Sequence, residues 1–149
     1  MTRPRPLGGT LETLGSLEKT SAHDPTATGA RAEEAACLWL RARSFAILER
    51  NYRIPQGEID IIARDGAELV FVEVKFLADT RRYFPEEQLT KQKRRRLTRA
   101  AAAWLANCPQ HAGPCRFDVL AVTPGASGSY EVHHVPAAFE AEENRWPNR

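Results

Sequence analysis

Two short groups of charged residues in the middle of the chain have types and a spacing that suit metal-dependent hydrolysis. Gly57-Glu58-Ile59-Asp60 opens one apolar run, and Glu73 and Lys75 stand two residues apart in the next. Carboxylate oxygens are suitable ligands for Mg²⁺, and a lysine beside the cation can orient an attacking water and offset transition-state charge. Each group alone is ordinary, because a Glu-x-Lys on a strand is usually an ion pair and a Gly-Glu-x-Asp is usually the exit from a loop.

The two apolar runs that carry these groups are expected to form an antiparallel hairpin. Residues 58–63 and 69–76 are rich in Ile, Val and Phe and are joined by Arg64-Asp65-Gly66-Ala67. An Asp-Gly pair between two such runs is a strong hairpin signal. Because side chains alternate across a strand, Glu73 and Lys75 share one face.

The turn decides which residues of the two strands face one another. A two-residue turn at Asp65-Gly66 would place Asp60 opposite Phe71. It would also place Glu58 opposite Glu73, a like-charge pair that requires a positive neighbour. Asp60 would then lie on the Glu73 face, one diagonal step away, so that one cation could bridge the two carboxylates. A turn with an odd number of residues would remove this shared face.

The rest of the chain supplies helices and further strands around the hairpin. Helices are expected at about 29–43, after Thr28 as N-cap, and at 86–107. The other expected strands are 45–48, 117–122 and 130–135, and the expected loops are 51–57, 77–85 and 124–129. This order predicts an α/β fold, a mixed central β-sheet flanked by helices.

Composition sets the limits of this interpretation. The chain has 149 residues, of which 42% are hydrophobic and 27% charged, with a formal net charge of only +2. We expect a polar, disordered tail at 1–27, one domain at 28–140 and a short tail at 141–149. No apolar run is long enough for a membrane span or a secretory leader, and the three cysteines form no Cys-x-x-Cys pair. A cytoplasmic protein with reduced thiols is therefore expected.

Gly57-Glu58-Ile59-Asp60-Ile61-Ile62-Ala63 and Val70-Phe71-Val72-Glu73-Val74-Lys75 together resemble the YraN family of bacterial proteins. That family is similar to the PD-(D/E)XK nuclease superfamily and to archaeal Holliday-junction resolvases. The resemblance runs from about Gly29 to Phe139, and it includes further positions at Glu33, Ala36, Leu40, Asn51-Tyr52-Arg53, Lys93 and Arg116-Phe117-Asp118.

The resemblance implies a restriction-endonuclease-like fold and a metal-dependent endonuclease. It implies Asp60 and Glu73 as ligands of Mg²⁺ or Mn²⁺ and Lys75 as the catalytic lysine. It also implies Glu33 as a further catalytic and metal-binding carboxylate on the first helix; without the resemblance, Glu33 would be an ordinary solvated helix residue. Resolvase-like relatives act as dimers, so a homodimer is expected by analogy.

The second expected helix carries a run of basic residues that suits phosphate binding. Its members are Lys91, Lys93, Arg94, Arg95, Arg96 and Arg99. Such runs are also common as solvated faces, but beside a nuclease-like site we interpret this one as a nucleic-acid-binding surface, with DNA favoured. Arg81, Arg82 and Tyr83 in the preceding loop would extend it, with Tyr83 stacking on a base.

Two other functions stay open at this point. Phe76 and Leu77 stand where the family usually has a small residue and then arginine, and the Phe-Gly usual in the next loop is replaced around Arg82-Tyr83. A non-catalytic nucleic-acid-binding module that keeps the fold is therefore the main alternative. A soluble scaffold with surface ion pairs is the other. His133-His134 puts one ring on each face of a strand, so the pair is expected to be structural.

Overall fold

The computed structural model describes residues 9–11, 25–78 and 89–141 of the chain. In chain order the elements are β1 (Gly9–Leu11), α1 (Pro25–Ala42), β2 (Ala46–Ile54), β3 (Gly57–Asp65), β4 (Glu68–Phe76), α2 (Lys91–Asn107), β5 (Cys115–Pro124) and β6 (Tyr130–Phe139). Two short 3₁₀ turns, Pro109–His111 and Ala126–Gly128, precede the last two strands.

The six strands of the described residues form one mixed sheet with the order β1-β6-β5-β4-β3-β2. Strands β4 and β5 pair in parallel, and the other neighbours pair antiparallel. Helix α2 lies in the connection between the two parallel strands, as a parallel crossover requires. The expected α/β architecture is confirmed, and it is consistent with a restriction-endonuclease-like fold.

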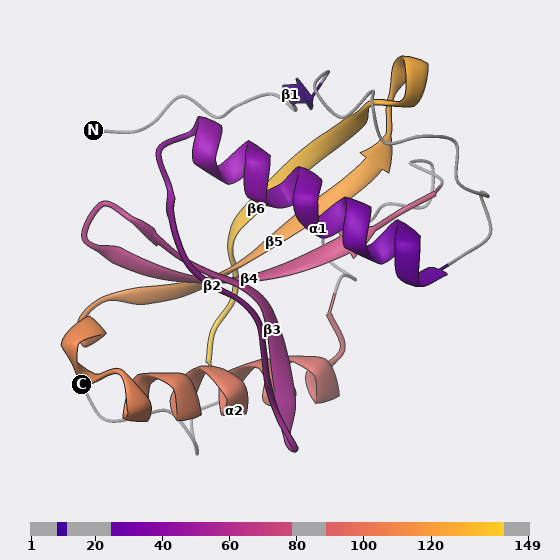
Figure 1. Ribbon diagram of the computed structural model, residues 1–149. Helices are drawn as coiled ribbons and strands as arrows, with labels where there is room; N and C mark the ends of the chain where they lie inside the picture. The colour runs from indigo at the N-terminus through magenta and orange to yellow at the C-terminus, as the bar shows by residue number, and fades with distance from the viewer. Residues whose placement is uncertain (1–8, 12–24, 79–88, 142–149) are drawn as a thin grey trace.

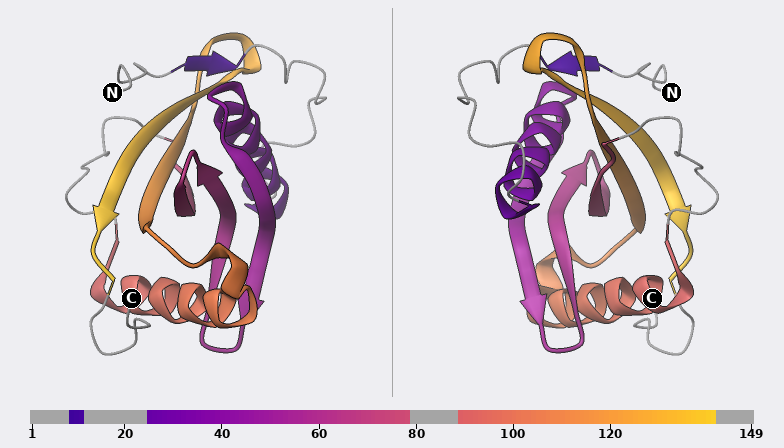
Figure 2. Two further views of the ribbon diagram at one scale, coloured as in Figure 1. Left: turned by 90° about the vertical axis from the view of Figure 1, so that its left-hand side faces the viewer. Right: turned by 90° about the vertical axis from the view of Figure 1, so that its right-hand side faces the viewer.

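The two helices cover opposite sides of the twisted sheet, as Figures 1 and 2 show. Helix α1 packs its buried stripe against the inner strands through a cluster that includes Trp39, Leu40, Ile61, Val72 and Leu120. Helix α2 packs against the other side through Leu97, Ala101, Trp104, Ile62 and Phe71. A charged residue on an inner strand is therefore held between apolar layers, unless the sheet opens beside it.

The hairpin is shifted from its expected register. Its pairs include Ile61 with Val72, Ile62 with Phe71 and Asp65 with Glu68, so that Gly66 and Ala67 form the turn. Gly66 has a positive φ of 61°, which glycine adopts without strain. Phe71 therefore faces Ile62 rather than Asp60, and the expected pairing of Glu58 with Glu73 is wrong. The turn has two residues in either register, so the face on which each side chain lies is unchanged.

Strand β2 is longer than the sequence indicated. Residues 51–54, expected to be part of a loop, continue the strand up to Pro55, because their backbone groups pair with the start of β3. A bulge between Ile47 and Glu49 shifts the register. Only Pro55 and Gln56 remain for the turn into β3.

Helix α2 begins later than expected. Thr90 is its N-cap, and the Thr90 hydroxyl accepts a hydrogen bond from the Lys93 backbone N–H at 3.1 Å. Leu89 and Thr90 lie outside the helix, and the expected helical residues 86–88 lie outside the described residues. Arg81, Arg82 and Tyr83 also lie outside them.

The N-terminal segment differs from the expected disordered tail, 1–27, at residues 9–11 and 25–27. Gly9–Leu11 pairs with β6 as a short strand, since the outer edge of β6 offers unpaired backbone groups. Helix α1 begins at Pro25, a few residues before the expected start. The remaining residues of 1–24 and all of 142–149 lie outside the described ranges.

Candidate active site

The candidate site begins where β3 and β4 separate. Their paired register ends at Ile61 and Val72, so the backbone N–H of Val74 has no backbone partner in β3. The Asp60 carboxylate takes this place, with Oδ2 accepting from the Val74 N–H at 2.8 Å. The local split in the sheet therefore fixes Asp60 against the backbone of β4.

Separation of the strands brings two carboxyl groups together. Continuing the register places Glu73 directly opposite Asp60, and Glu73 is buried with only 4% of its surface exposed. Burial, and then the nearby charge of Glu73, raise the pKa of Asp60 to about 7. Two carboxylates that share a buried position favour a proton or a cation between them. The predicted common face of Asp60 and Glu73 is thus confirmed, although they are opposite rather than diagonal.

A lysine from α2 contacts this pair. Lys93 Nζ lies 2.6 Å from Glu73 Oε1. Burial by itself would lower the pKa of Lys93, but the hydrogen bond to Glu73 and its charge outweigh this effect, so the pKa is raised. The sequence indicates Lys93 only as a phosphate-binding residue, and its contact with Glu73 is a finding of the structure.

The spacing along α2 could have revealed this contact. Lys93 continues the buried stripe of Leu97, Ala100, Ala101 and Trp104 by one helical turn toward the N-terminus. A lysine in line with an apolar stripe must direct its ammonium toward the sheet, or bend away from it.

Helix α1 brings Glu33 close enough to Asp60 for the two carboxyl groups to interact electrostatically. Glu33 is partly buried, and its pKa is raised by burial and then by the charge of Asp60. It precedes the buried residues Ala36 and Leu40 on the same helical stripe. The expectation that Glu33 points from the first helix toward the cluster therefore agrees with the structure.

Asn51 holds Glu33 in this position. In the orientation that satisfies both groups, the Asn51 side-chain amide donates to Glu33 Oε2 at 3.0 Å. Asn51 lies opposite Asp60 in the β2–β3 register, with a positive φ of 54°. A strained backbone at a non-glycine residue beside a carboxylate cluster is typical of functional sites. Sequence reasoning gave Asn51 no role of its own.

The remaining expected site residue, Lys75, is partly buried on β4. It lies two residues beyond Glu73 and hence on the same face of the strand. Among the residues that the structure describes, no three His, Cys, Asp or Glu side chains form a set that could hold a metal ion. The role of Glu33 as a third ligand therefore stays a prediction, as do the roles of Asp60, Glu73 and Lys75.

The other basic residues of α2 lie around Lys93, whose side chain reaches the carboxylate pair. Lys91, Arg95 and Arg96 are exposed, while Lys93, Arg94 and Arg99 are partly buried. The helix therefore combines an exposed run of positive charge with one lysine that reaches a buried carboxylate.

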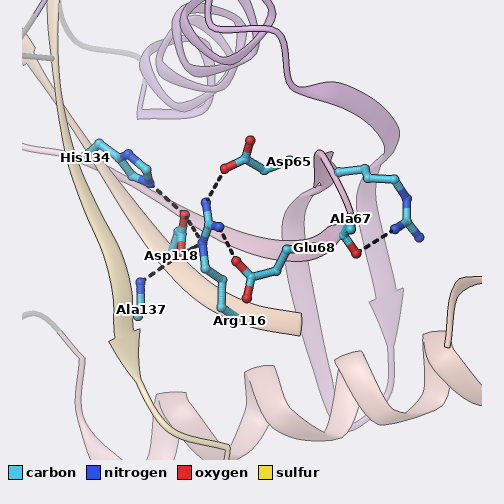
Figure 3. Close-up of polar contacts among 8 residues, drawn as sticks. Asp65, Ala67, Glu68, Arg116, Asp118, His134 and Ala137 are labelled. Carbon is cyan, nitrogen blue, oxygen red and sulfur yellow. Dashed lines mark hydrogen bonds and ion pairs between the residues drawn. The ribbon is translucent and has the colours of Figure 1, made fainter. Parts of the chain in front are cut away.

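A second polar cluster lies on the α1 side of the sheet (Figure 3). Asp118 is 1% exposed and receives hydrogen bonds from Arg116 Nε at 3.0 Å and from the Ala137 N–H at 2.9 Å. His134 Nε2 lies 2.7 Å from Asp118, and Arg116 also binds Asp65 and Glu68. Burial alone would raise the pKa of Asp118, but these partners outweigh it and lower the pKa. The structural role expected for His134 agrees with this network.

Within the described ranges, neither helix has the length and apolar character needed to cross a bilayer. The sheet, the two helices and the split between β3 and β4 define an α/β protein with paired carboxylates at an opening in its sheet. This chain belongs to the uncharacterised protein family UPF0102, whose pattern matches residues 32–122. The matched segment includes every residue of the candidate site.

Three relatives illustrate the extent of the similarity. A UPF0102 protein of Beutenbergia cavernae is 45% identical over 73% of this chain and 92% of its own length. One from Symbiobacterium thermophilum is 44% identical over 76% of this chain and 96% of its own. One from Chlorobaculum parvum is 41% identical over 78% of this chain and 95% of its own. The YraN resemblance is thereby confirmed, and the names of these relatives state no activity.

Proposed function

We propose that this chain is a divalent-metal-dependent endonuclease that hydrolyses phosphodiester bonds in nucleic acid, with DNA favoured as substrate. The observation that carries the proposal is the buried pair of Asp60 and Glu73 at the split of the sheet, in contact with the basic helix α2 through Lys93. Two adjacent carboxylates buried in an apolar core lower the stability of the fold, and such costly groups are typical of functional sites.

The residues present fit Mg²⁺ or Mn²⁺. Both donors are hard carboxylate oxygens, and Mg²⁺ is commonly held by one or two carboxylates while it keeps several waters. Burial, and then the charge of Glu73, raise the pKa of Asp60, and a bound cation would offset both effects by neutralising the two carboxylates. When bound, the cation polarises the phosphate and supplies a water of lowered pKa. Glu33, held by Asn51, is proposed as the further carboxylate ligand of the cation.

The chain's own residues supply the remaining functions. Lys75 is proposed to position the attacking water and to offset the charge that develops on the phosphate. Lys91, Lys93, Arg94, Arg95 and Arg99 are proposed to bind the nucleic-acid backbone. A cytoplasmic location and a homodimer belong to the same proposal, and light scattering of the purified protein tests the dimer.

A second candidate function is a non-catalytic nucleic-acid-binding module. The observation that favours it is that Asp60, Glu73 and Glu33 do not form a three-ligand set among the described residues. The same basic helix would then bind nucleic acid without cleavage.

Incubation of the full chain with linear, flapped and four-way DNAs, with and without Mg²⁺ or Mn²⁺, separates the two functions. The endonuclease is supported if any DNA of the panel is cleaved only in the presence of the cation and is not cleaved by Asp60→Asn. Binding of DNA without cleavage, together with no uptake of Mn²⁺ in a calorimetric titration, would establish the binding module. A matching panel of RNA tests the preference for DNA.

A further inference from the structure

We propose that Lys93 couples cation binding to nucleic-acid binding: its ammonium neutralises Glu73 in the free protein, and a divalent cation that takes Glu73 releases Lys93 to a phosphate of the bound strand. This inference rests on the proposed function and deepens it. Lys93 exchanges Glu73 for a phosphate when the cation binds, whereas Lys91 and Arg95 bind phosphate with or without the cation.

The exposed fractions of the two side chains show that Lys93 reaches from the solvent to a buried carboxylate. The Lys93 side chain is 45% exposed, whereas the Glu73 side chain that it contacts is 5% exposed. The ammonium therefore reaches a buried carboxylate from the solvent edge of the site. A modest rotation of its flexible four-carbon side chain would return it to the surface, beside Lys91 and Arg95.

The backbone beneath Lys93 is fixed while its side chain can exchange partners. The Thr90 hydroxyl accepts from the Lys93 N–H at 3.1 Å, so the first turn of α2 is anchored by its cap. Asp60 and Glu58 also face Lys93 and add to the negative field that holds its ammonium. A divalent cation at Asp60 and Glu73 would cancel that field and repel the ammonium from the same oxygens.

Charge at the site then favours a phosphate. With both carboxylates ionised, Asp60, Glu73 and Lys93 together carry one excess negative charge. Arrival of a divalent cation changes this to one excess positive charge, next to an exposed basic helix. The released Lys93 ammonium, beside the exposed Lys91 and Arg95, is then available to bind a phosphate anion.

The test measures DNA binding and cation binding separately. Affinity for a short fluorescein-labelled DNA duplex is measured by anisotropy with and without Ca²⁺, for wild type, Lys93→Met and Lys91→Met. Calorimetry of the same proteins without DNA gives the affinity for Ca²⁺ and for Mn²⁺. Lys93→Gln is a second variant in case the Met variant has a lower melting temperature.

Without Ca²⁺, Lys93→Met should weaken DNA binding only by the small factor expected for the loss of one positive charge, because Lys93 is then engaged by Glu73. With Ca²⁺ it should weaken DNA binding by roughly five- to tenfold, the size of a typical coupling between sites. Its cation affinity without DNA should equal or exceed that of wild type, because a competing positive charge is gone. Lys91→Met should weaken DNA binding by the same factor with and without Ca²⁺.

Equal loss of DNA affinity in both conditions for Lys93→Met would overturn the inference and leave Lys93 as an ordinary phosphate contact. No loss in either condition would make the Lys93–Glu73 contact a structural ion pair. Both outcomes leave the proposed function intact. Failure of wild type to bind either cation would overturn the proposed function and the inference together.

Discussion

The Asp60 carboxylate accepts a hydrogen bond from the Val74 backbone N–H at 2.8 Å, where the paired register of β3 and β4 has ended. One side chain thereby replaces a missing bond of the sheet and reaches the buried Glu73. The hydrogen bond favours the ionised form of Asp60, but burial and the charge of Glu73 outweigh it and raise its pKa to about 7. The same group thus supports the backbone and destabilises the fold when it is charged.

Replacement of this carboxyl group by an amide should stabilise the free protein at alkaline pH. A pKa raised on folding contributes stability below the unfolded pKa and loses it as pH rises through the folded value, here about 7. Asp60→Asn keeps an oxygen for the Val74 N–H and cannot ionise. Its advantage over wild type should grow by roughly 3 kcal/mol between about pH 5 and about pH 8, since about two of the pKa units between 3.8 and about 7 lie in that range and each corresponds to about 1.4 kcal/mol.

Urea unfolding of both proteins at about pH 5 and about pH 8 measures how much this advantage grows. The same variant should lose Mn²⁺ binding in calorimetry. An advantage that does not grow between the two pH values would contradict the account of Asp60 and Glu73 as a strained pair.

Lys75→Ala should separate cleavage from metal binding. Lys75 is not a cation ligand in the proposed site, so Mn²⁺ should bind the variant nearly as it binds wild type. Cleavage of the DNA panel should fall on the order of 100-fold or more, because water positioning and charge stabilisation are lost together. Calorimetry and single-turnover cleavage measure the two effects. Wild-type cleavage by Lys75→Ala would reduce Lys75 to a structural role.

The exposed part of the basic helix should determine how DNA binding depends on salt. Lys91 and Arg95 are both exposed on α2. Replacing both with Ala should weaken binding to all sequences alike and reduce the slope of log affinity against log salt by up to about 0.9 for each phosphate that is no longer neutralised. Anisotropy titrations over a range of NaCl concentrations measure the slope. An unchanged slope would make this face a solvated surface.

Gly57→Ala should destabilise the fold although alanine is a small residue. A Cβ at Gly57 would lie 2.1 Å from the backbone carbonyl oxygen of Arg96, so the β2–β3 turn could not keep its approach to α2. We expect a loss of about 1 to 3 kcal/mol in the free energy of unfolding, the typical range for an overpacked core site.

Gly29→Ala is the matched control for this substitution. A Cβ at Gly29 meets nothing within 4 Å, and Gly29 lies inside α1. Alanine should therefore stabilise the helix by about 0.5 to 1 kcal/mol. Denaturation curves of the two variants should shift in opposite directions. A Gly57→Ala variant as stable as wild type would show that α2 can move away from the hairpin without cost.

Asp118 should make the fold sensitive to acid. Its pKa is lowered by its partners, although burial opposes them, so its contribution to stability is present above the unfolded pKa and is lost as pH falls through the folded value. Asp118→Asn should be about 2 to 3 kcal/mol less stable at neutral pH and lose less stability below about pH 4 than wild type does.

Glu131→Gln provides the comparison for Asp118. Glu131 lies 3.9 Å from His133 in a partly exposed pair, so its replacement should change little. Thermal unfolding between about pH 3 and pH 7 measures all three proteins. Parallel pH profiles for wild type and Asp118→Asn would exclude Asp118 as a source of the acid sensitivity.

The sequence by itself determined which strands carry the site and on which face its residues lie. Side-chain alternation is a local property with a period of two, so the shared face does not depend on which two residues form the turn. Asp60 and Glu73 stay on one face whether Asp65-Gly66 or Gly66-Ala67 forms the turn, because both turns contain two residues. The helical and strand order that predicted an α/β sheet is local in the same sense.

Only the tertiary structure decided which residues contact one another in the site. The separation of β3 from β4, the strained Asn51 beside Glu33, and the Lys93–Glu73 contact each depend on groups that are distant in the chain. Lys93 lies one helical turn before the buried stripe of α2, and periodicity indicates its direction, whereas only the family resemblance indicated the direction of Glu33. Which partner each charge meets follows from the packing angles of two helices on a twisted sheet, and long-range packing rather than local sequence sets those angles.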